Sequence, residues 1–506
     1  MLIISNNNIS KINIINTTSY ISYVEIMLTV VHEEIEPIYQ KKRLFFIEYM
    51  EMIGMCIRNT VQILGVSEED KLVTELGNLY SIETYLEVRT LKERSTEIAF
   101  LLMDIQNKDE IAPTLRDAFM ASMESDIPVI LYNAKKESMA KLCALGIDTE
   151  CCIVFPYMNE AKIIDILDSR LEARTKESSR TASQKSDGSM NISPPTEISE
   201  RPSSVELFSE FSSQEKARII EAKIETGITK DEYELLAKRN ASYGDSPGVL
   251  PAHQRKTVYA RLNRNDYPIH GSAQKLSNNL TFELVLIASY SDPRCKYLRI
   301  TTLGAGFNPS QYGNILCDNT YERGWFAGNY AIHIQAKSDQ IFVKGSSPKN
   351  CNNVTQYTTD SSFSVGVDIS RDPGFSSQYT ISESETHNIS DFDIINKSAG
   401  NVGDWDFQLG MTKDNIWNVF LEQFMRKAQV KQIPVLAKEN LQTECVITWY
   451  KDDMDFRQAV ELDLGWRADY YYCNVTGDWT EYQMHCTQWY LHVWTTYLVD
   501  FGQVSA

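Results

Sequence analysis

The chain has 506 residues, of which 43% are hydrophobic, and it carries a formal net charge of −19 at pH 7. That length predicts two to four domains, and that hydrophobic content is enough to build real cores. Because phosphate binding requires a basic surface, the charge excludes a general nucleic-acid-binding protein.

The first residues carry no recognisable targeting signal. Residues 1–26 are biased toward Asn and Ile and have neither a basic leader nor a clean cleavage site. No run of 18 apolar residues predicts a membrane-spanning helix. We expect an N-terminal extension over residues 1–40. We also expect a protein that is soluble, in the cytoplasm or secreted by an unidentified route, until it meets a membrane.

Residues 41–174 alternate between strand-like and helix-like segments. The pattern predicts strands at 43–49, 83–89, 97–105, 126–133 and 151–157, and helices at 50–64, 112–125, 135–146 and 159–174. The third helix should end on Gly146 as a C-cap. Apolar strands interleaved with helices favour a flavodoxin-like parallel sheet that is covered on both faces.

The next two segments differ in composition. Residues 175–213 are rich in Ser, Thr, Lys, Glu and Pro, which is typical of a disordered, flexible linker. Residues 214–240 predict two short helices, with Thr229 and Glu232 at capping-box spacing. The segment loosely resembles small oligomerisation modules of bacterial proteins, and a plain helical spacer is the alternative interpretation.

From residue 247 to residue 506 short alternating strands replace helical periodicity. This alternating pattern predicts an all-β domain with strands at 280–290, 296–303, 330–336, 340–345, 444–450 and 489–499. The whole chain is therefore expected to be a multidomain α/β plus all-β protein.

Cysteine and histidine spacing does not point to a metal site. No CxxC pair or Cys/His cluster has zinc spacing, so no metal is expected. Cys473 and Cys486 flank a turn and form a candidate disulfide across two strands.

One hairpin, residues 363–383, is unusually poor in charge. Most odd positions of its arms are apolar: Phe363, Val365, Val367, Ile369, Phe375, Tyr379 and Ile381, with Arg371, Ser377 and Glu383 as the exceptions. Even positions are small and polar: Ser364, Gly366, Asp368, Ser370, Gln378, Thr380 and Ser382. Successive side chains point to opposite faces, so one face could meet lipid and the other a water-filled lumen.

The turn must preserve this parity. A three-residue tip, Asp372-Pro373-Gly374, would pair Val365 with Ile381 and Phe363 with Glu383. Each arm then has about nine residues, near the length of a tilted transmembrane strand. An ordinary sandwich hairpin with one face on the core is the alternative.

The order of segments over about 270–500 resembles the leukocidin/hemolysin superfamily of β-barrel pore-forming toxins. Residues 280–306 resemble its early cap strands, the hairpin stands where the family has its stem, and 466–494 resembles its aromatic last cap strands. The resemblance implies a β-sandwich with a pre-stem hairpin. It also implies a homo-oligomeric ring that binds membrane lipids or surface glycans and inserts one shared barrel.

Residues 413–420, KDNIWNVF, resemble a segment near the membrane-facing rim of that family. Trp417 is therefore the candidate rim residue for lipid, since tryptophan favours membrane interfaces. A core tryptophan is the alternative.

Residues 97–133 resemble nucleoside 2-deoxyribosyltransferase-like and TIR-like α/β domains. Those domains place a catalytic glutamate on the helix that here reads PTLRDAF, and Asp117 stands at the matching position, one methylene shorter. Because a small misplacement costs a large factor in rate, a catalytic Asp117 is not favoured over an exposed helix carboxylate. No P-loop, GxGxxG, GxSxG or HExxH occurs, so no cofactor is expected, with a nucleotide ligand as the alternative.

These observations predict a pore-forming toxin whose N-terminal domain serves as a sensor or latency module and is not an enzyme. The alternative is a nucleoside- or NAD-cleaving or nucleotide-sensing α/β enzyme that carries a non-lytic lipid- or glycan-binding β module.

Overall fold

The chain divides into two units, Met1–Asn59 and Thr60–Ala506. The predicted extension (1–40) and the predicted strand at 43–49 lie outside the described residues. The computed structural model describes residues 59–106, 111–157, 161–167, 170–185, 187–202, 211–227, 253–266, 276–289, 294–303, 309, 323–338, 340–352, 356–366, 378–388, 391–423, 426–438, 441, 443–451, 459–478 and 480–505.

The N-terminal half begins as a parallel sheet with helices. Four parallel strands, β1 (Thr60–Leu64), β2 (Ser81–Thr84), β3 (Ile98–Asp104) and β4 (Val129–Ala134), stand in the order β4-β3-β1-β2. The helices are α2 (Lys71–Leu76), α3 (Val88–Glu93), α4 (Pro113–Glu124) and α5 (Lys136–Cys143). The predicted helices at 112–125 and 135–146 and the strands at 97–105, 126–133 and 151–157 are present.

The all-parallel, flavodoxin-like prediction is wrong beyond β4. The next strand, β6 (Thr149–Tyr157), runs antiparallel to β4, and β7 (Ala161–Ile166) runs antiparallel to β6. The predicted helix at 159–174 is replaced by β7 and the start of β8. Ile163 and Ile164 are both fully buried, which a strand with two covered faces requires and a one-sided helix does not.

Two smaller predictions in this half are also corrected. Residues 60–64, expected at the end of a helix, form β1, and the predicted strand at 83–89 ends at Thr84, before α3 begins at Val88. Val61 and Ile63 are buried between neighbours on both sides, so pairing with β2 and β3 outweighed local helical spacing.

The two halves of the chain share one sheet. Strand β7 pairs in parallel with β11 (Arg255–Asp266), and this pairing joins the N-terminal strands to those of the C-terminal half. The sheet has eleven strands in the order β15-β22-β13-β12-β11-β7-β6-β4-β3-β1-β2. Its C-terminal members are β12 (Leu276–Ala288), β13 (Lys296–Leu303), β15 (Phe342–Ser347) and β22 (Val446–Lys451).

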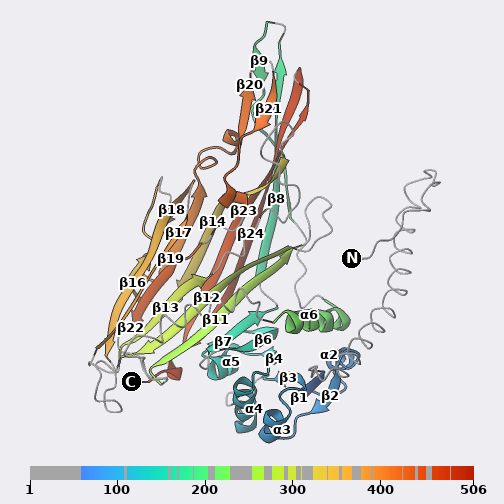
Figure 1. The fold of residues 1–506 in the computed structure, drawn as a ribbon, viewed down its shortest axis with the longest axis vertical. Helices are drawn as coiled ribbons and strands as arrows, with labels where there is room; N and C mark the ends of the chain where they lie inside the picture. Colours follow the sequence, from blue (N-terminus) through green and yellow to red (C-terminus); the bar gives the residue numbers. More distant parts are fainter. Residues whose placement is uncertain are drawn as a thin grey trace, which may run out of the picture. The chain divides into compact units, whose positions relative to one another are not determined.

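Most of the described residues within the predicted linker, 175–213, are in strands. Its residues belong to β8 (Arg170–Gln184), β9 (Met190–Ile192) and β10 (Thr196–Pro202), and β8 pairs with β24 (Glu481–Asp500) along Glu481–Trp494 (Figure 1). Between residues 176 and 184 only Ala182 is buried, so a polar composition suits this half-covered strand as well as it suits a linker. Arg180 also forms an ion pair with Glu422, at 3.2 Å.

The second large sheet contains the longest strands. Its order is β10-β8-β24-β23-β14-β19-β18, with β14 (Arg323–Ala336), β18 (Phe392–Asn396), β19 (Val402–Leu409) and β23 (Ala459–Gly477). A short strand, β5 (Leu145–Gly146), also pairs with β24. Trp405, Trp449 and Trp466, which come from strands of both sheets, are buried in one core. The six strands predicted after residue 247 are all present.

The remaining described elements are short. Helix α6 (Ser213–Thr226) has a capping box between Ser212 and Glu215; the box predicted at Thr229 and Glu232 lies outside the described residues. The others are η4 (Ile416–Val419), β20 (Phe420–Gln423), β21 (Arg426–Val430), α8 (Val435–Lys438) and η5 (Phe501–Gln503). Among the described residues, none of the helices combines the length and apolarity that crossing a bilayer requires.

Candidate functional site

The charge-poor hairpin forms a sheet of its own. Strands β16 (Gln356–Gly366) and β17 (Gln378–Asn388) pair only with each other among the described residues. Neither arm therefore shares a backbone ladder with either large sheet. The tip predicted at Asp372-Pro373-Gly374 lies outside the described residues, as do Val367, Asp368, Ile369, Ser370 and Phe375.

The register differs from the predicted one by two residues. Phe363 pairs with Ile381, Val365 with Tyr379, and Glu383 with Ser361. A shift by two keeps odd positions opposite odd ones, so the two predicted faces survive. The observed register sets apolar residues opposite apolar residues, whereas the predicted register would have set Phe363 opposite Glu383. Cross-strand pairing of like with like explains the difference.

The two faces differ in exposure at the base of the hairpin. Thr359, an odd position, is only 3% exposed, and its hydroxyl donates to Glu444 Oε1 at 3.2 Å. The even positions Gln356, Thr358 and Thr386 are exposed. By alternation, Phe363 and Val365 share the face of Thr359. At the base of the hairpin, the odd position Thr359 therefore turns toward the body of the protein and the even positions turn away from it.

The even face is almost free of charge. Its ladder positions are Gln356, Thr358, Asp360, Ser362, Ser364, Gly366, Gln378, Thr380, Ser382, Ser384, Thr386 and Asn388, and only Asp360 is charged. The odd-numbered positions nearest the base include Glu383, Glu385 and His387. Charge therefore gathers at the base of the hairpin, and the part toward the tip is neutral.

The hairpin is clamped to the body at its root. Cys351 and Ile394 exchange two backbone hydrogen bonds, of 3.0 and 2.7 Å. The amide of Asn396 donates to the carbonyl of Pro348 at 2.6 Å, and Trp405 Nε1 donates to the same oxygen at 3.2 Å. The root is thus tied to the core, and next to it the Ser347 hydroxyl donates to the carbonyl of Thr358 in β16, at 3.5 Å. Sequence reasoning missed this clamp because its members are far apart in the chain.

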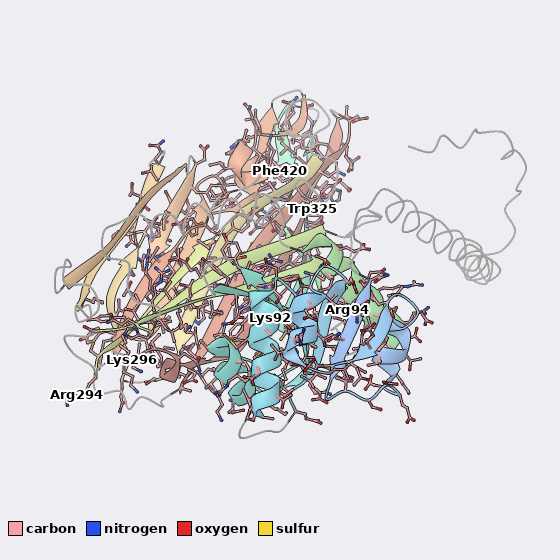
Figure 2. The ribbon with its side chains drawn as sticks, turned by 60° about the horizontal axis from the view of Figure 1, so that its bottom comes forward. Lys92, Arg94, Arg294, Lys296, Trp325 and Phe420 are labelled. Carbon is pink, nitrogen blue, oxygen red and sulfur yellow. The ribbon has the colours of Figure 1, made fainter. Side chains whose placement is uncertain are left out.

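Trp417 lies in η4 and is 6% exposed. Its ring stacks on the ring of Phe420, which is labelled in Figure 2, and the two ring centroids are 5.5 Å apart. In this arrangement Trp417 is a core residue, the alternative weighed above, and it presents little surface to a membrane.

Cys473 and Cys486 occupy directly paired positions of β23 and β24. Their sulfur atoms are 3.8 Å apart and both side chains are buried as free thiols. The predicted disulfide therefore has its partners in register, and its formation stays a prediction.

Asp117 lies on the exposed side of α4. Burial raises the pKa of Tyr85, and the negative charge of Asp117 adds to this effect, which places the two side chains near each other. No described contact joins Asp117 to another acid, a base or a nucleophile, so its catalytic role also stays a prediction. Among the described residues, no group of three or more His, Cys, Asp and Glu could hold a metal ion.

Comparison with solved structures gives several matches to pore-forming toxins. A structure described as "Pore forming protein" is 12% identical with a TM-score of 0.31, and the match covers 49% of this chain and 92% of that one. Clostridium perfringens delta-toxin is 13% identical with a TM-score of 0.29, covering 46% and 89%. The Clostridium perfringens NetB toxin in its membrane-inserted form is 13% identical with a TM-score of 0.26, covering 47% and 95%.

Each of these matches covers just under half of this chain and most of the chain it is matched to. None of the three descriptions concerns a nucleoside 2-deoxyribosyltransferase or a TIR domain, so that resemblance of the N-terminal half rests on sequence alone. No protein-family model and no curated protein matches the chain. At these identities and TM-scores the matches concern the fold, and the function proposed next rests on the chain's own geometry.

Proposed function

We propose that this protein forms membrane pores by assembling into a homo-oligomeric ring in which each protomer contributes the β16–β17 hairpin to a shared β-barrel. The observation that carries the proposal is that, among the described residues, the hairpin is a two-stranded sheet of its own whose backbone bonds to the body lie at its root. Releasing its arms would break no ladder hydrogen bond to either large sheet among the described residues. The arms can thus change position while the two large sheets stay folded.

The dimensions of the hairpin suit a membrane strand. On the tip side of the Ser361–Glu383 pair the sequence has about ten residues on each side of Asp372 (362–371 and 373–382), and a tilted strand needs about 9–11 residues to cross the hydrocarbon core. One hairpin alone would leave unpaired backbone groups in lipid, so several copies must close into a barrel. This requirement is the physical reason for proposing a ring.

Alternation assigns the two faces of the proposed barrel. Phe363, Val365, Tyr379 and Ile381 share the odd parity and would face lipid, and the small polar residues of even parity would line the lumen. Glu383 now pairs with Ser361, on the root side of the apolar pairs. It would therefore stand at the membrane edge, where a charge is tolerated, and not opposite Phe363 within the bilayer.

The N-terminal half supports a role as a latency or sensor module that is built into the cap. Its strands join the C-terminal half through β7–β11 and β8–β24, so a trigger would act through the shared sheets and not through a loose tether. Membrane lipids or surface glycans are the proposed targets of the ring.

A reversible lock tests the proposal. Thr359→Cys and Glu444→Cys introduce two thiols where the hairpin contacts the body, and a short reducible linker would join them. We expect the linked protein to release no dye from vesicles and to regain release on reduction. The vesicles should be made from several natural lipid extracts, because the target lipid is part of the proposal.

The matched control is a linked pair at Lys337→Cys and Asp463→Cys, which form an ion pair at 2.9 Å between segments that stay together in the body. Linking that pair should leave dye release unchanged. Release by the protein locked at Thr359 and Glu444, or no release by the reduced protein from any of the vesicles, would contradict the proposal.

A further inference from the structure

The even face of the hairpin has one charged ladder position, Asp360. Asp360 pairs with Ser384, one position to the root side of the pair between Ser361 and Glu383. Every other even position of the ladder is neutral, and serine, threonine and glycine predominate among them. Asp360 is therefore the described position at which a charge shares the parity that the proposed barrel turns toward its lumen.

The place of Asp360 along its arm corresponds to the mouth of that barrel. The neighbouring Thr359 is 3% exposed, and its hydroxyl donates to Glu444 Oε1 of the body at 3.2 Å, so this part of β16 lies next to the body. The tip side of the arm, from residue 362 to residue 371, has about ten residues, which is enough to cross the hydrocarbon core. Asp360 would thus stand between the body and the membrane, at the end of the barrel nearest the body.

The hairpin itself brings almost no positive charge into the barrel. Its acidic residues from 356 to 388 are Asp360, Asp368, Asp372, Glu383 and Glu385. Arg371 is the only lysine or arginine in the same range, and His387 stands at an odd ladder position. In an extended arm the distance from Asp360 to Arg371 would be about 36 Å, at ~3.3 Å per residue. That distance is several times the Debye length of about 10 Å at 0.1 M salt, so Arg371 would not neutralise the mouth.

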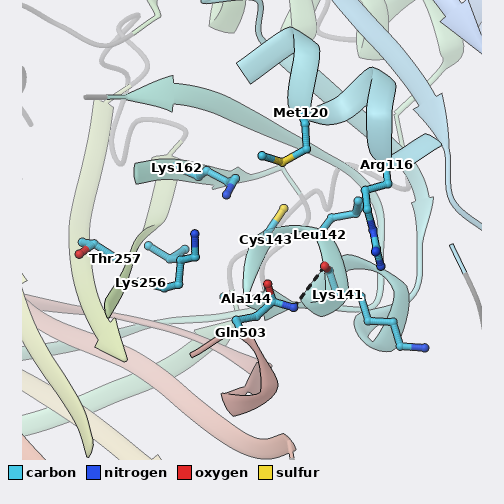
Figure 3. Close-up of a pocket in the computed structure, with 11 residues that line it drawn as sticks. Arg116, Met120, Lys141, Leu142, Cys143, Ala144, Lys162, Lys256, Thr257 and Gln503 are labelled. Atoms are coloured by element: carbon cyan, nitrogen blue, oxygen red, sulfur yellow. Dashed lines mark hydrogen bonds between the residues drawn. The ribbon is translucent and has the colours of Figure 1, made fainter. Parts of the chain in front are cut away.

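The basic residues of the body do not travel with the hairpin. Lys349 and Lys397 flank it in the sequence, but both lie on the body side of the backbone bridge that clamps the root, and Lys397 forms an ion pair with Asp406. Other basic residues belong to the large sheets. Figure 3 shows two of them at a pocket of the body, Lys162 on β7 and Lys256 on β11. Because the proposed function keeps both sheets folded, these side chains would stay outside the barrel.

We propose that Asp360 makes the pore selective for cations. The inference rests on the proposed ring, in which each protomer would contribute one Asp360 and the carboxylates would form a ring of their own at the mouth. Such a ring attracts cations and repels anions within about a Debye length of the wall. The adjacent even positions, Ser362 and Ser382, are small, so the carboxylates would face an open, hydrated lumen. They would therefore discriminate between ions by the sign of the charge and not by size.

Reversal potentials of pores in planar bilayers test this inference. The bilayers are made from the same natural lipid extracts as the vesicles and separate two KCl solutions of different concentration. The potential at zero current gives the ratio of potassium to chloride permeability. We expect the unaltered protein to favour potassium at about 0.1 M salt and to approach equal permeability near 1 M, where the Debye length falls to about 3 Å. This measurement needs no substitution, so it does not depend on the folding of a variant.

Variants at neighbouring ladder positions locate the charge. Asp360→Asn and Asp360→Ser should each lower the ratio of potassium to chloride permeability by about 2-fold or more, and Asp360→Glu should retain it. The matched control is Glu385→Gln, which removes a carboxylate beside the Asp360–Ser384 pair but at an odd position, and it should leave the ratio unchanged. The comparison is repeated with Asp368→Asn in every protein, because a carboxylate of the same parity in the sequence would otherwise conceal part of the loss.

The outcomes separate this inference from the proposed function. Absence of conducting pores in every bilayer would overturn both. Pores of the unaltered protein that favour chloride, or that show no preference at 0.1 M salt, would leave pore formation standing and overturn the role of Asp360. Pores of Asp360→Asn or Asp360→Ser with an unchanged permeability ratio would do the same. An equal loss of selectivity with Glu385→Gln would contradict the assignment of the two faces and would also overturn the inference.

Discussion

Gly146 illustrates how close packing, and not backbone conformation, can require a glycine. A Cβ atom at this position would lie 1.8 Å from the carbonyl oxygen of Lys136 and 2.7 Å from the backbone nitrogen of Ala140. Both are backbone atoms of α5, so they cannot move aside as a flexible side chain can. The residue that takes the left-handed conformation after α5 is Ala144, with φ of 66°. The C-cap of α5 is therefore Ala144, two residues before the predicted Gly146.

Opposite effects are expected from two exchanges between glycine and alanine. Gly146→Ala should lower the free energy of unfolding by about 2–4 kcal/mol, since it overpacks a buried backbone contact. Ala144→Gly should raise it by up to about 1 kcal/mol, since it relieves the left-handed strain. Urea unfolding of both variants measures the two values. A neutral Gly146→Ala variant would show that the contact with α5 is looser than described.

At the scale of an element, the sequence of the hairpin determines which residues share a face more firmly than it determines which residues pair across the two strands. Alternation of small polar and apolar residues determines which residues share a face, and every even shift preserves it. The choice among those shifts depends on which residues meet across the strands. Here the choice matches Phe363 with Ile381 and places Glu383 opposite Ser361.

Paired cysteines distinguish the two registers. Ser361→Cys with Glu383→Cys joins directly opposite positions and should form a disulfide on mild oxidation. Phe363→Cys with Glu383→Cys joins diagonal positions about 7–8 Å apart, which is beyond the usual span between the Cα atoms of a disulfide. Mass spectrometry of a proteolytic digest gives the yield of each bridge. A higher yield from the second pair would instead support the predicted register, in which Asp372-Pro373-Gly374 forms a three-residue tip.

At the scale of the whole molecule, the N-terminal half completes both large sheets. β8 covers the edge of β24 along fourteen paired positions, from Glu481 with Ser183 to Trp494 with Arg170, and β7 covers the edge of β11. The ion pairs of Asp165 with Arg261, at 3.3 Å, and with Lys223, at 3.1 Å, lie at the second of these seams, where Asp165 is fully buried. A C-terminal half without these strands would expose two long edges.

Truncation should therefore behave differently from the removal of a tethered domain. A fragment of residues 247–506 is expected to lose cooperative thermal unfolding and to aggregate, because open edges pair with one another. The fragment 59–506 keeps both sheets and serves as the control. Thermal melts and size-exclusion chromatography compare the two. A monomeric 247–506 fragment with a cooperative melt and dye release would instead establish independent modules.

The sequence by itself determined six strands after residue 247, the strands at 97–105 and 126–133 and the helices at 112–125 and 135–146 of the parallel core, and the parity of the hairpin, because all of these follow from local periodicity. Tertiary structure decided what local periodicity leaves open. β7 (Ala161–Ile166) and β8 (Arg170–Gln184) are strands because β6, β11 and β24 offered backbone partners, and such partners are not encoded nearby in the chain.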